Sequence, residues 1–286
     1  MTVQVFTDST SYIDSKTKKE LQITTVPLNV SFNDISFKET EIDNSTFYQL
    51  MKKKGIPQSS QPTFGDLYET MQLLLKKSKN LLGIFISSEM SGTYATAQAV
   101  KKKILQENKE ASIEIIDSRS NCMQLGFAVI QASKAALLGK SLAEVKNAAE
   151  KNIERSKFLF IPANLEYLKK GGRIGGAAAL LGHILKIIPI LTVKNGQTAV
   201  FKKIRTQKKA LQTMIETMAA DIEHYGLGEV IVHHINCLPE ATSLANQIKE
   251  KLQSEVKILD IGPVIGLHVG PGAIGIAYYT QQILTD

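Results

Sequence analysis

Short apolar runs recur along the first half of the chain, and helix-like segments separate them. The runs are VQVFTDST at residues 3–10, NLLGIFISSEMS at 80–91 and SIEIIDSRS at 112–120. Helical character follows the second run after Gly92, and it follows the third run from Met123 to Leu138. Because strands that alternate with helices form βαβ units, this half of the chain predicts a mainly parallel sheet.

Hydroxyl and acidic side chains stand at the end of each predicted strand. They are Asp8, Ser9 and Thr10, then Ser87, Ser88 and Ser91, and finally Asp117 and Ser118. Open parallel sheets bind their ligands beyond the carboxyl ends of the strands. The sequence therefore predicts a ligand site at this edge of the sheet.

The pattern changes after Lys157, where strands, glycine-rich turns and helices mix. Asn195-Gly196 is a strong hairpin signal. Further along, we predict helices at 208–224 and 240–253 and strands at 229–234, 256–261 and 273–279. Because 286 residues exceed the usual size of one core, we predict two α/β domains, an N-terminal one over residues 1–160 and a C-terminal one over 161–286.

The composition is that of an ordinary globular protein, with 43% hydrophobic residues. The sequence has no signal-peptide pattern and no apolar run of membrane-spanning length, so we expect a soluble, cytoplasmic protein. Cys122 and Cys237 lie far apart and lack the spacing of metal ligands. We therefore expect reduced thiols and no metal site.

A formal charge of +7 raises the question of nucleic-acid binding, since lysine and arginine neutralise phosphates. The basic residues come in short groups on separate predicted elements, such as residues 52–54 and 101–103, without interleaved aromatic residues. Such groups are typical of solvated helix faces. We therefore predict no nucleic-acid partner.

Two short segments match phosphate-binding motifs, but their context does not fit. GPGAIG at residues 270–275 has the glycine spacing of a dinucleotide site, yet a strand-like segment follows it where a helix is required. Gly139-Lys140-Ser141 resembles the end of a P-loop, but Lys134 stands in place of its leading glycine. Neither segment predicts a nucleotide site.

Serine and histidine residues leave a hydrolase as the alternative interpretation. Ser91 could be the nucleophile, with His268 or His234 as the base that takes its proton. The chain lacks the G-x-S-x-G elbow, and residue types alone do not identify a catalytic triad. An acyl or phosphate ester hydrolase therefore stays open at this point.

Ordered motifs along nearly the whole chain resemble those of the DegV family. In the first half they are TDST at residues 7–10, SSQPT at 59–63, SSEMSGTY at 87–94 and DS at 117–118. In the second half they are LEYLKKGGRIGG at 165–176, IRTQKKAL at 204–211 and IGPVIGLHVGPGAIGI at 261–276. Ile188 departs from the pattern, because the family commonly has lysine directly before the proline.

The resemblance implies an N-terminal three-layer α/β/α domain with a mainly parallel sheet and a C-terminal two-layer α/β domain. It also implies that one long-chain fatty acid, such as palmitate, is bound between the domains. Family members resemble the non-catalytic, lipid-binding subunit of a fatty acid kinase that serves phospholipid synthesis. The implied partners are the ATP-binding kinase subunit, which phosphorylates the bound carboxylate, and transiently a membrane surface. No cofactor is expected.

The same motifs imply roles for individual residues. By position, Thr63, Ser91 and His268 hydrogen-bond the fatty-acid carboxylate. Arg173 and Arg205 are the expected contacts for the kinase. The residues of the supporting loops are Ser88, Gly92, Thr93 and Gly270.

A bound acyl chain needs an apolar wall, and the sequence supplies candidates. Each buried methylene contributes about 0.8 kcal/mol, so a long chain offers on the order of 10 kcal/mol before association costs. The candidate wall residues are Phe85, Ile86, Leu125, Phe127, Ile161, Leu165, Leu180, Leu181, Ile187 and Ile190. Core packing explains most of these equally well.

Overall fold

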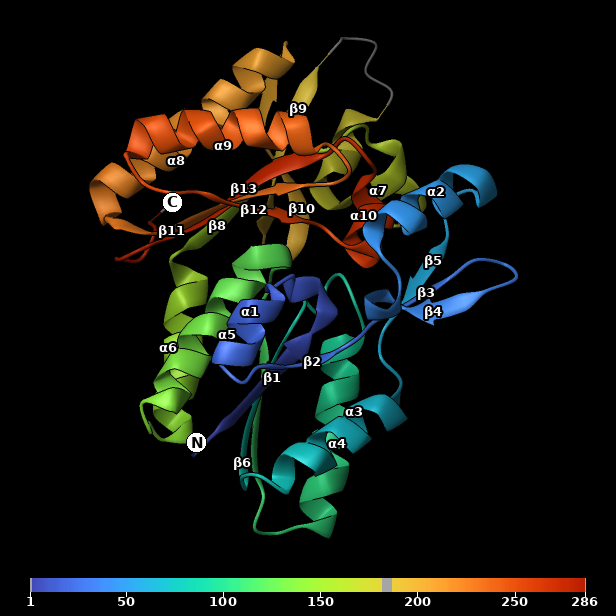
Figure 1. The fold of residues 1–286 in the computed structure, drawn as a ribbon, viewed down its shortest axis with the longest axis vertical. Helices are drawn as coiled ribbons and strands as arrows, with labels where there is room; N and C mark the ends of the chain where they lie inside the picture. Colours follow the sequence, from blue (N-terminus) through green and yellow to red (C-terminus); the bar gives the residue numbers. More distant parts are fainter. Residues whose placement is uncertain (1, 182–186, 286) are drawn as a thin grey trace. The chain divides into compact units, whose positions relative to one another are not determined.

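The computed structural model describes residues 2–181 and 187–285, which form two compact units (Figure 1). Unit 1 comprises Met1–Glu41 and Ser59–Glu154, and unit 2 comprises Ile42–Gln58 and Arg155–Asp286. The division after Glu154 lies slightly before the predicted position at residue 160. Unit 2 also contains residues 42–58, which precede most of unit 1 in the sequence.

A four-stranded parallel sheet forms the centre of unit 1, with the strand order β2-β1-β6-β7. The strands are β1 (Gln4–Asp8), β2 (Thr24–Val26), β6 (Asn80–Phe85) and β7 (Ser112–Asp117). The apolar runs of the sequence form these central strands, because a strand covered on both faces needs side chains that tolerate burial on each side.

Helices cover both faces of this sheet, so unit 1 has the expected three layers (Figure 1). The helices are α1 (Ser15–Glu20), α3 (Phe64–Leu75), α4 (Thr93–Glu107), α5 (Cys122–Leu137) and α6 (Leu142–Glu154). The core against α3 and α4 includes Phe6, Met71, Phe85 and Val100. Phe85, one of the candidate wall residues, is therefore a core residue.

A small sheet and two single turns complete the N-terminal region. The sheet has the order β4-β3-β5, with β3 (Asn29–Ser31), β4 (Ser36–Lys38) and β5 (Gln58–Ser60). The turns are η1 (Ser9–Ser11) and η2 (Glu39–Glu41). Helix α2 (Asn44–Lys54) belongs to unit 2.

Unit 2 is built on a six-stranded sheet with the order β10-β9-β8-β13-β11-β12. The strands are β8 (Ser156–Ile161), β9 (Ile188–Lys194), β10 (Gln197–Ile204), β11 (Leu227–His234), β12 (Lys257–Asp260) and β13 (Ile274–Thr280). Only β11 and β12 are parallel neighbours among these described strands.

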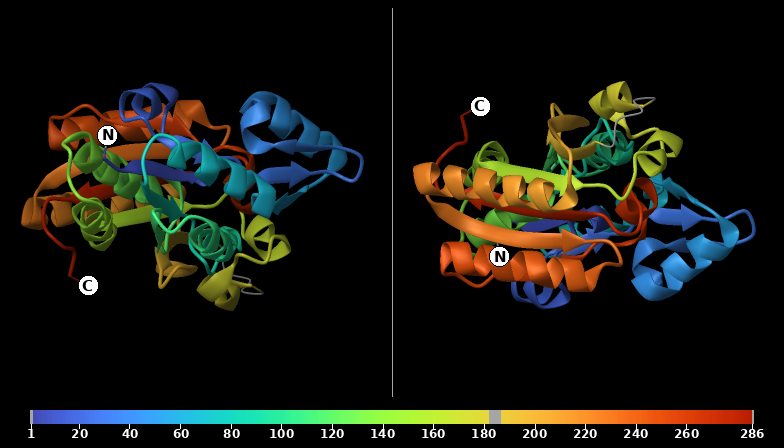
Figure 2. Two further views of the ribbon diagram at one scale, coloured as in Figure 1. Left: turned by 90° about the horizontal axis from the view of Figure 1, so that it is seen from below. Right: turned by 90° about the horizontal axis from the view of Figure 1, so that it is seen from above.

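Two long helices, α8 (Gln207–Tyr225) and α9 (Leu238–Leu252), pack on this sheet (Figure 2). Their apolar faces share a core with Ile161 and Ile190. These two candidate wall residues are thus also core residues. Three short helical segments contribute to the remainder of the unit, namely α7 (Glu166–Lys170), η3 (Gly175–Leu180) and α10 (Pro263–Val269).

Two local predictions are confirmed by the backbone. Asn195 and Gly196 have φ angles of 52° and 79° and join β9 to β10 in an antiparallel hairpin. Such positive angles at both central residues are those of a type I′ turn. GPGAIG continues into β13 at Ile274, so it lacks the strand-to-helix context of a dinucleotide site.

Candidate functional site

The carboxyl ends of β1 and β6 are joined through a buried carboxylate. Asp8 accepts hydrogen bonds from the backbone N–H of Ile86 at 2.7 Å and of Thr10 at 2.9 Å. The Thr10 hydroxyl donates to the same side chain at 2.5 Å. Asp8 is fully buried, and burial raises the pKa of its carboxyl. The Asp8 oxygens therefore hold in place the backbone that follows β1 and β6.

A second carboxylate holds the loop between β6 and α4. Asp117, at the end of β7, accepts from the Ser88 hydroxyl at 2.5 Å and from the Ser88 N–H at 3.2 Å. It also accepts from the backbone N–H of Arg119 at 2.9 Å. The Arg119 guanidinium lies 3.3 Å from the Ser88 hydroxyl oxygen. Ser88 is thus a loop-fixing residue, and Arg119 is a further member that the sequence reasoning missed.

The same loop carries Ser91, which is half-buried just before α4. Its hydroxyl oxygen lies 2.9 Å from that of Thr93 and accepts from the Thr93 N–H at 3.3 Å. A Cβ at Gly92 would overlap the side-chain amide of Gln61. The Gln61 amide in turn donates to Thr96 at 2.7 Å. The structure therefore brings the SSQPT segment against the SSEMSGT loop within unit 1.

Thr63, at the end of SSQPT, is the N-cap of α3. Its hydroxyl donates to the Asp66 carboxylate at 2.5 Å and accepts from the Asp66 N–H at 3.1 Å, which makes a capping box. The Thr63 N–H donates back to Asp66 at 3.2 Å. Thr63 is exposed, but its hydroxyl proton is already directed to Asp66. Donation to a ligand therefore requires this hydroxyl to rotate.

In unit 2, His268 lies on α10 and is 9% exposed. A Cβ at Gly171 would overlap the His268 ring, so the ring lies directly against the backbone of the GGRI element. Burial, together with the positive charge of Arg173, lowers the pKa of His268 to about 4. The imidazole is consequently neutral at pH 7.

The other predicted residues of unit 2 are Gly270, Arg173 and Arg205. Gly270 has a φ angle of +90°, and a Cβ there would overlap the ring of Tyr167. Glycine is therefore required at this position. Arg173 is exposed, and its guanidinium donates to the carbonyl of Gly171 at 2.7 Å. Arg205 is also exposed and directly follows β10.

The predicted carboxylate residues are divided between the units. Thr63 and Ser91 belong to unit 1, where Gln61 links their segments. His268 belongs to unit 2, together with Gly270 and Arg173. Hydroxyl groups and a neutral imidazole can each donate hydrogen bonds to an anion.

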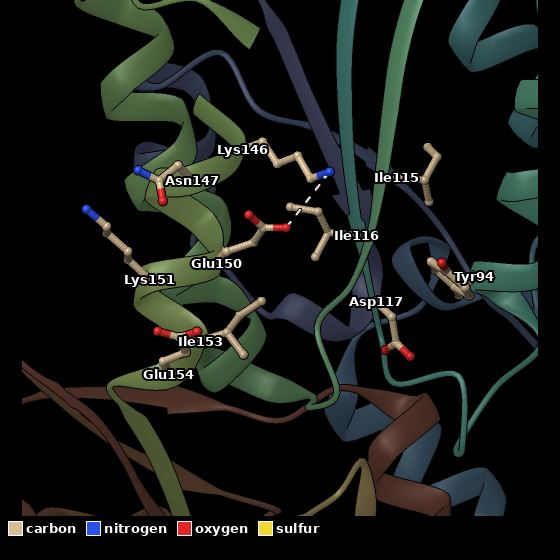
Figure 3. A pocket seen from close by; sticks show the side chains of 10 residues that line it. All are labelled: Tyr94, Ile115, Ile116, Asp117, Lys146, Asn147, Glu150, Lys151, Ile153 and Glu154. Carbon is tan, nitrogen blue, oxygen red and sulfur yellow. Dashed lines mark ion pairs between the residues drawn. The ribbon is translucent and has the colours of Figure 1, made fainter. Parts of the chain in front are cut away.

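Unit 1 also contains an open pocket of about 560 Å³ beside the edge strand β7 (Figure 3). Tyr94 and Asp117 line it, and Lys146 and Glu150 of α6 face it with their charged groups 4.0 Å apart. Apolar ligands avoid such surroundings, since charged groups lose hydration when covered. This pocket is therefore unsuited to an acyl chain.

Metal and membrane-spanning features are absent from the described part of the chain. Residues 2–181 and 187–285 contain no cluster of three or more His, Cys, Asp or Glu side chains that could hold a metal ion. Over the same ranges, no helix combines the length and apolar character needed to cross a bilayer. Cys122 and Cys237 are buried free thiols, and burial raises the pKa of each.

Comparison with known proteins places these motifs in one family. The family described as "Uncharacterised protein, DegV family" matches residues 2–281. A DegV domain-containing protein from Clostridium acetobutylicum is 57% identical over 282 residues, which cover 99% of each chain.

Solved structures agree with this placement. DegV from Bacillus subtilis, described as a fatty acid binding protein, has a TM-score of 0.89 and 31% identity, with 98% of this chain and 99% of that chain covered. A DegV family protein from Thermus thermophilus, described by its fatty acid binding, has a TM-score of 0.86 and 26% identity, with 98% and 100% coverage. The mixed α/β fold is shared with both, and the chain belongs to the DegV family.

Proposed function

We propose that this protein binds one long-chain fatty acid and that Thr63, Ser91 and His268 hold its carboxylate. The observation that carries the proposal is the whole-length similarity to the fatty acid binding protein of Bacillus subtilis. The positions of hydroxyl and imidazole donors support it, because Ser91 and Thr63 stand in neighbouring segments and His268 is neutral. The protein is accordingly a carrier and not an enzyme.

The chemistry of the donors suits reversible binding. A carboxylate removed from water needs hydrogen bonds to its oxygens, and an unpaired buried charge would cost several kcal/mol. The Ser91 hydroxyl and a neutral His268 can each donate one bond without forming an ion pair. Phe64, next to Thr63, is 45% exposed and offers apolar surface close to the proposed head-group residues.

The hydrolase interpretation is not favoured by the setting of Ser91. The Ser91 hydroxyl oxygen lies 2.9 Å from that of Thr93. The loop that carries Ser91 also lacks the G-x-S-x-G elbow. Turnover of model esters by the purified protein, abolished by Ser91→Ala, would overturn the carrier proposal.

Fatty-acid retention provides the direct test. We expect native mass spectrometry to show the protein with one acyl chain, and palmitate titration to show that Ser91→Ala and His268→Ala each raise Kd about tenfold or more. Hydrogen bonds to charged groups contribute about 1.5–3 kcal/mol, which corresponds to this range. A protein that neither carries nor takes up an acyl chain would contradict the proposal.

Matched variants control for general effects of substitution. Ser112 is an exposed serine of unit 1 on β7, and His224 is an exposed histidine of unit 2 on α8. Ser112→Ala and His224→Ala should keep the palmitate Kd of the wild type. Equal losses in the controls would show that the effect is not specific to the proposed site.

We further propose that a separate ATP-dependent kinase subunit phosphorylates the bound carboxylate and that Arg173 and Arg205 contact it. Both side chains are exposed and positively charged. Arg173→Ala and Arg205→Ala should slow acyl phosphate formation by a cognate kinase while palmitate Kd stays unchanged. The measurement is phosphate transfer from labelled ATP. Wild-type rates in both variants would remove these arginines from the proposed contact.

A further inference from the structure

Helix α2 contacts the segment that begins α10, although the two helices are far apart in the sequence. The Tyr48 hydroxyl donates to the carbonyl of Ile261 at 3.1 Å. The Asn44 amide donates to the same carbonyl at 3.2 Å and to the Asp260 carboxylate at 2.6 Å. Ile261 lies directly before Gly262, the N-cap of α10. Two side chains of α2 therefore fix the point where α10 starts.

Tyr48 also fits against the middle of α10. A Cβ at Gly266 would overlap the phenol oxygen of Tyr48, so the ring occupies the space that a larger residue would fill. Tyr48 is only 6% exposed. Its phenol is thus buried against the backbone of α10 as well as hydrogen-bonded at the start of that helix.

The opposite side of α10 carries His268. Residues two positions apart in an α-helix face directions about 200° apart, so Gly266 and His268 lie on opposite sides. The His268 ring contacts the backbone of Gly171, which follows α7. Helix α10 is therefore packed with Tyr48 of α2 on one side and the Gly171 turn on the other.

Helix α10 depends on these contacts for its position. It spans only Pro263–Val269, and its N-cap is Gly262, a residue type without a side chain. Helices this short are not stable by themselves in water, and tertiary packing provides most of their stability. A change on the Tyr48 side should therefore be felt on the His268 side.

We infer that Tyr48 is a positioning residue that sets the location of the His268 imidazole through α10. This inference rests on the proposed role of His268 in carboxylate binding. Tyr48 acts by holding the helix and does not need to touch the fatty acid. A carboxylate hydrogen bond is sensitive to donor position, so a shift of α10 weakens it.

The test compares two phenol hydroxyls of the same unit. Tyr48→Phe removes the bond to Ile261 but keeps the ring, while Tyr225→Phe removes a hydroxyl that lies 2.5 Å from that of Thr285, at the end of α8. We expect Tyr48→Phe to raise the palmitate Kd about two- to tenfold, the range of a typical hydrogen bond, and Tyr225→Phe to leave it unchanged.

Proton NMR of the histidine ring provides the readout that separates positioning from general stability. In the protein without palmitate, the His268 ring signals, assigned by their loss in His268→Gln, should move in Tyr48→Phe and stay in place in Tyr225→Phe. Gly266→Ala adds a methyl group in the space that the Tyr48 phenol oxygen occupies. This variant should therefore move the His268 ring signals as well.

A double-variant cycle completes the test. In the His268→Ala background, Tyr48→Phe should cause no further rise in palmitate Kd, because the residue it positions is gone. Unchanged His268 signals in Tyr48→Phe, or a full additional loss in the double variant, would overturn the inference. If the wild-type protein binds no palmitate, the proposed function fails, while the NMR comparison still decides whether Tyr48 positions His268.

Discussion

Carboxylates at the strand ends of unit 1 bind the protein's own backbone. Asp8 accepts from Ile86 and Thr10, and Asp117 accepts from Ser88 and the backbone that follows it. Carboxylate oxygens that already accept backbone hydrogen bonds have no proton to donate to a fatty-acid carboxylate. Its recognition is therefore left to hydroxyl groups, which can donate. We therefore expect Asp8 and Asp117 to fix the loops and the Ser91 hydroxyl to donate a hydrogen bond to the carboxylate of the fatty acid.

Asp117→Ala tests this division of roles. The substitution removes the acceptor of the exposed N–H groups of Ser88 and Arg119, so we expect a loss of about 0.5–1.5 kcal/mol in the free energy of unfolding and weaker palmitate binding. Asp117→Asn keeps an oxygen acceptor and should lose less of both. Urea denaturation and palmitate titration are the measurements. Palmitate binding that is unchanged in Asp117→Ala would show that the loop does not depend on this carboxylate.

At the scale of elements, local chemistry predicts the strands and turns well. The three apolar runs of the first half became β1, β6 and β7, and parallel pairing brought their polar ends to one edge. Asn195-Gly196 gave its hairpin because both residues accept positive φ angles. The capping box at Thr63 and Asp66 was readable as T-x-x-D, a signal that the sequence reasoning passed over.

Elements fixed by tertiary packing were not predictable in the same way. Helix α10 is buried along its whole length, so it has no polar face and no helical period to read. Helix α2 buries Phe47, Tyr48 and Met51, but an apolar face does not say which sheet or helix will cover it. The contacts of Tyr48 with α10 therefore had no sequence signal.

Some basic residues find a structural explanation at this scale. Lys202 and Lys203 lie on β10, which is the edge strand of the unit 2 sheet. Charged side chains on an edge strand oppose pairing with another chain. This role fits the absence of a nucleic-acid motif and explains two of the exposed lysines without a ligand.

At the scale of the whole molecule, histidines are distributed unevenly. All five lie in residues assigned to unit 2, and none lies in unit 1. Three of them, His233, His234 and His268, are buried. Burial lowers the pKa of His233 and of His268 to about 4. Acid should therefore act on unit 2 through groups that unit 1 does not have.

The sign of the effect follows from proton binding. In the unfolded chain a histidine takes up a proton below about pH 6.5, whereas these two stay neutral in the folded protein until about pH 4. The unfolded state thus binds more protons in this window, and the stability of unit 2 falls as pH falls through it. The loss by pH 4.5 is on the order of 2–3 kcal/mol for each histidine.

His233→Gln should make unit 2 less sensitive to acid. Glutamine can still donate to the carbonyl of Leu259, which lies 3.1 Å from His233 Nδ1, but it takes up no proton. Hydrogen exchange of peptides from β11, measured at pH 7 and pH 4.5, should show a smaller loss of protection in this variant than in wild type. His224→Gln, which changes an exposed histidine, should behave as wild type. An equal loss of protection in His233→Gln and wild type would show that burial of His233 does not limit the acid stability of unit 2.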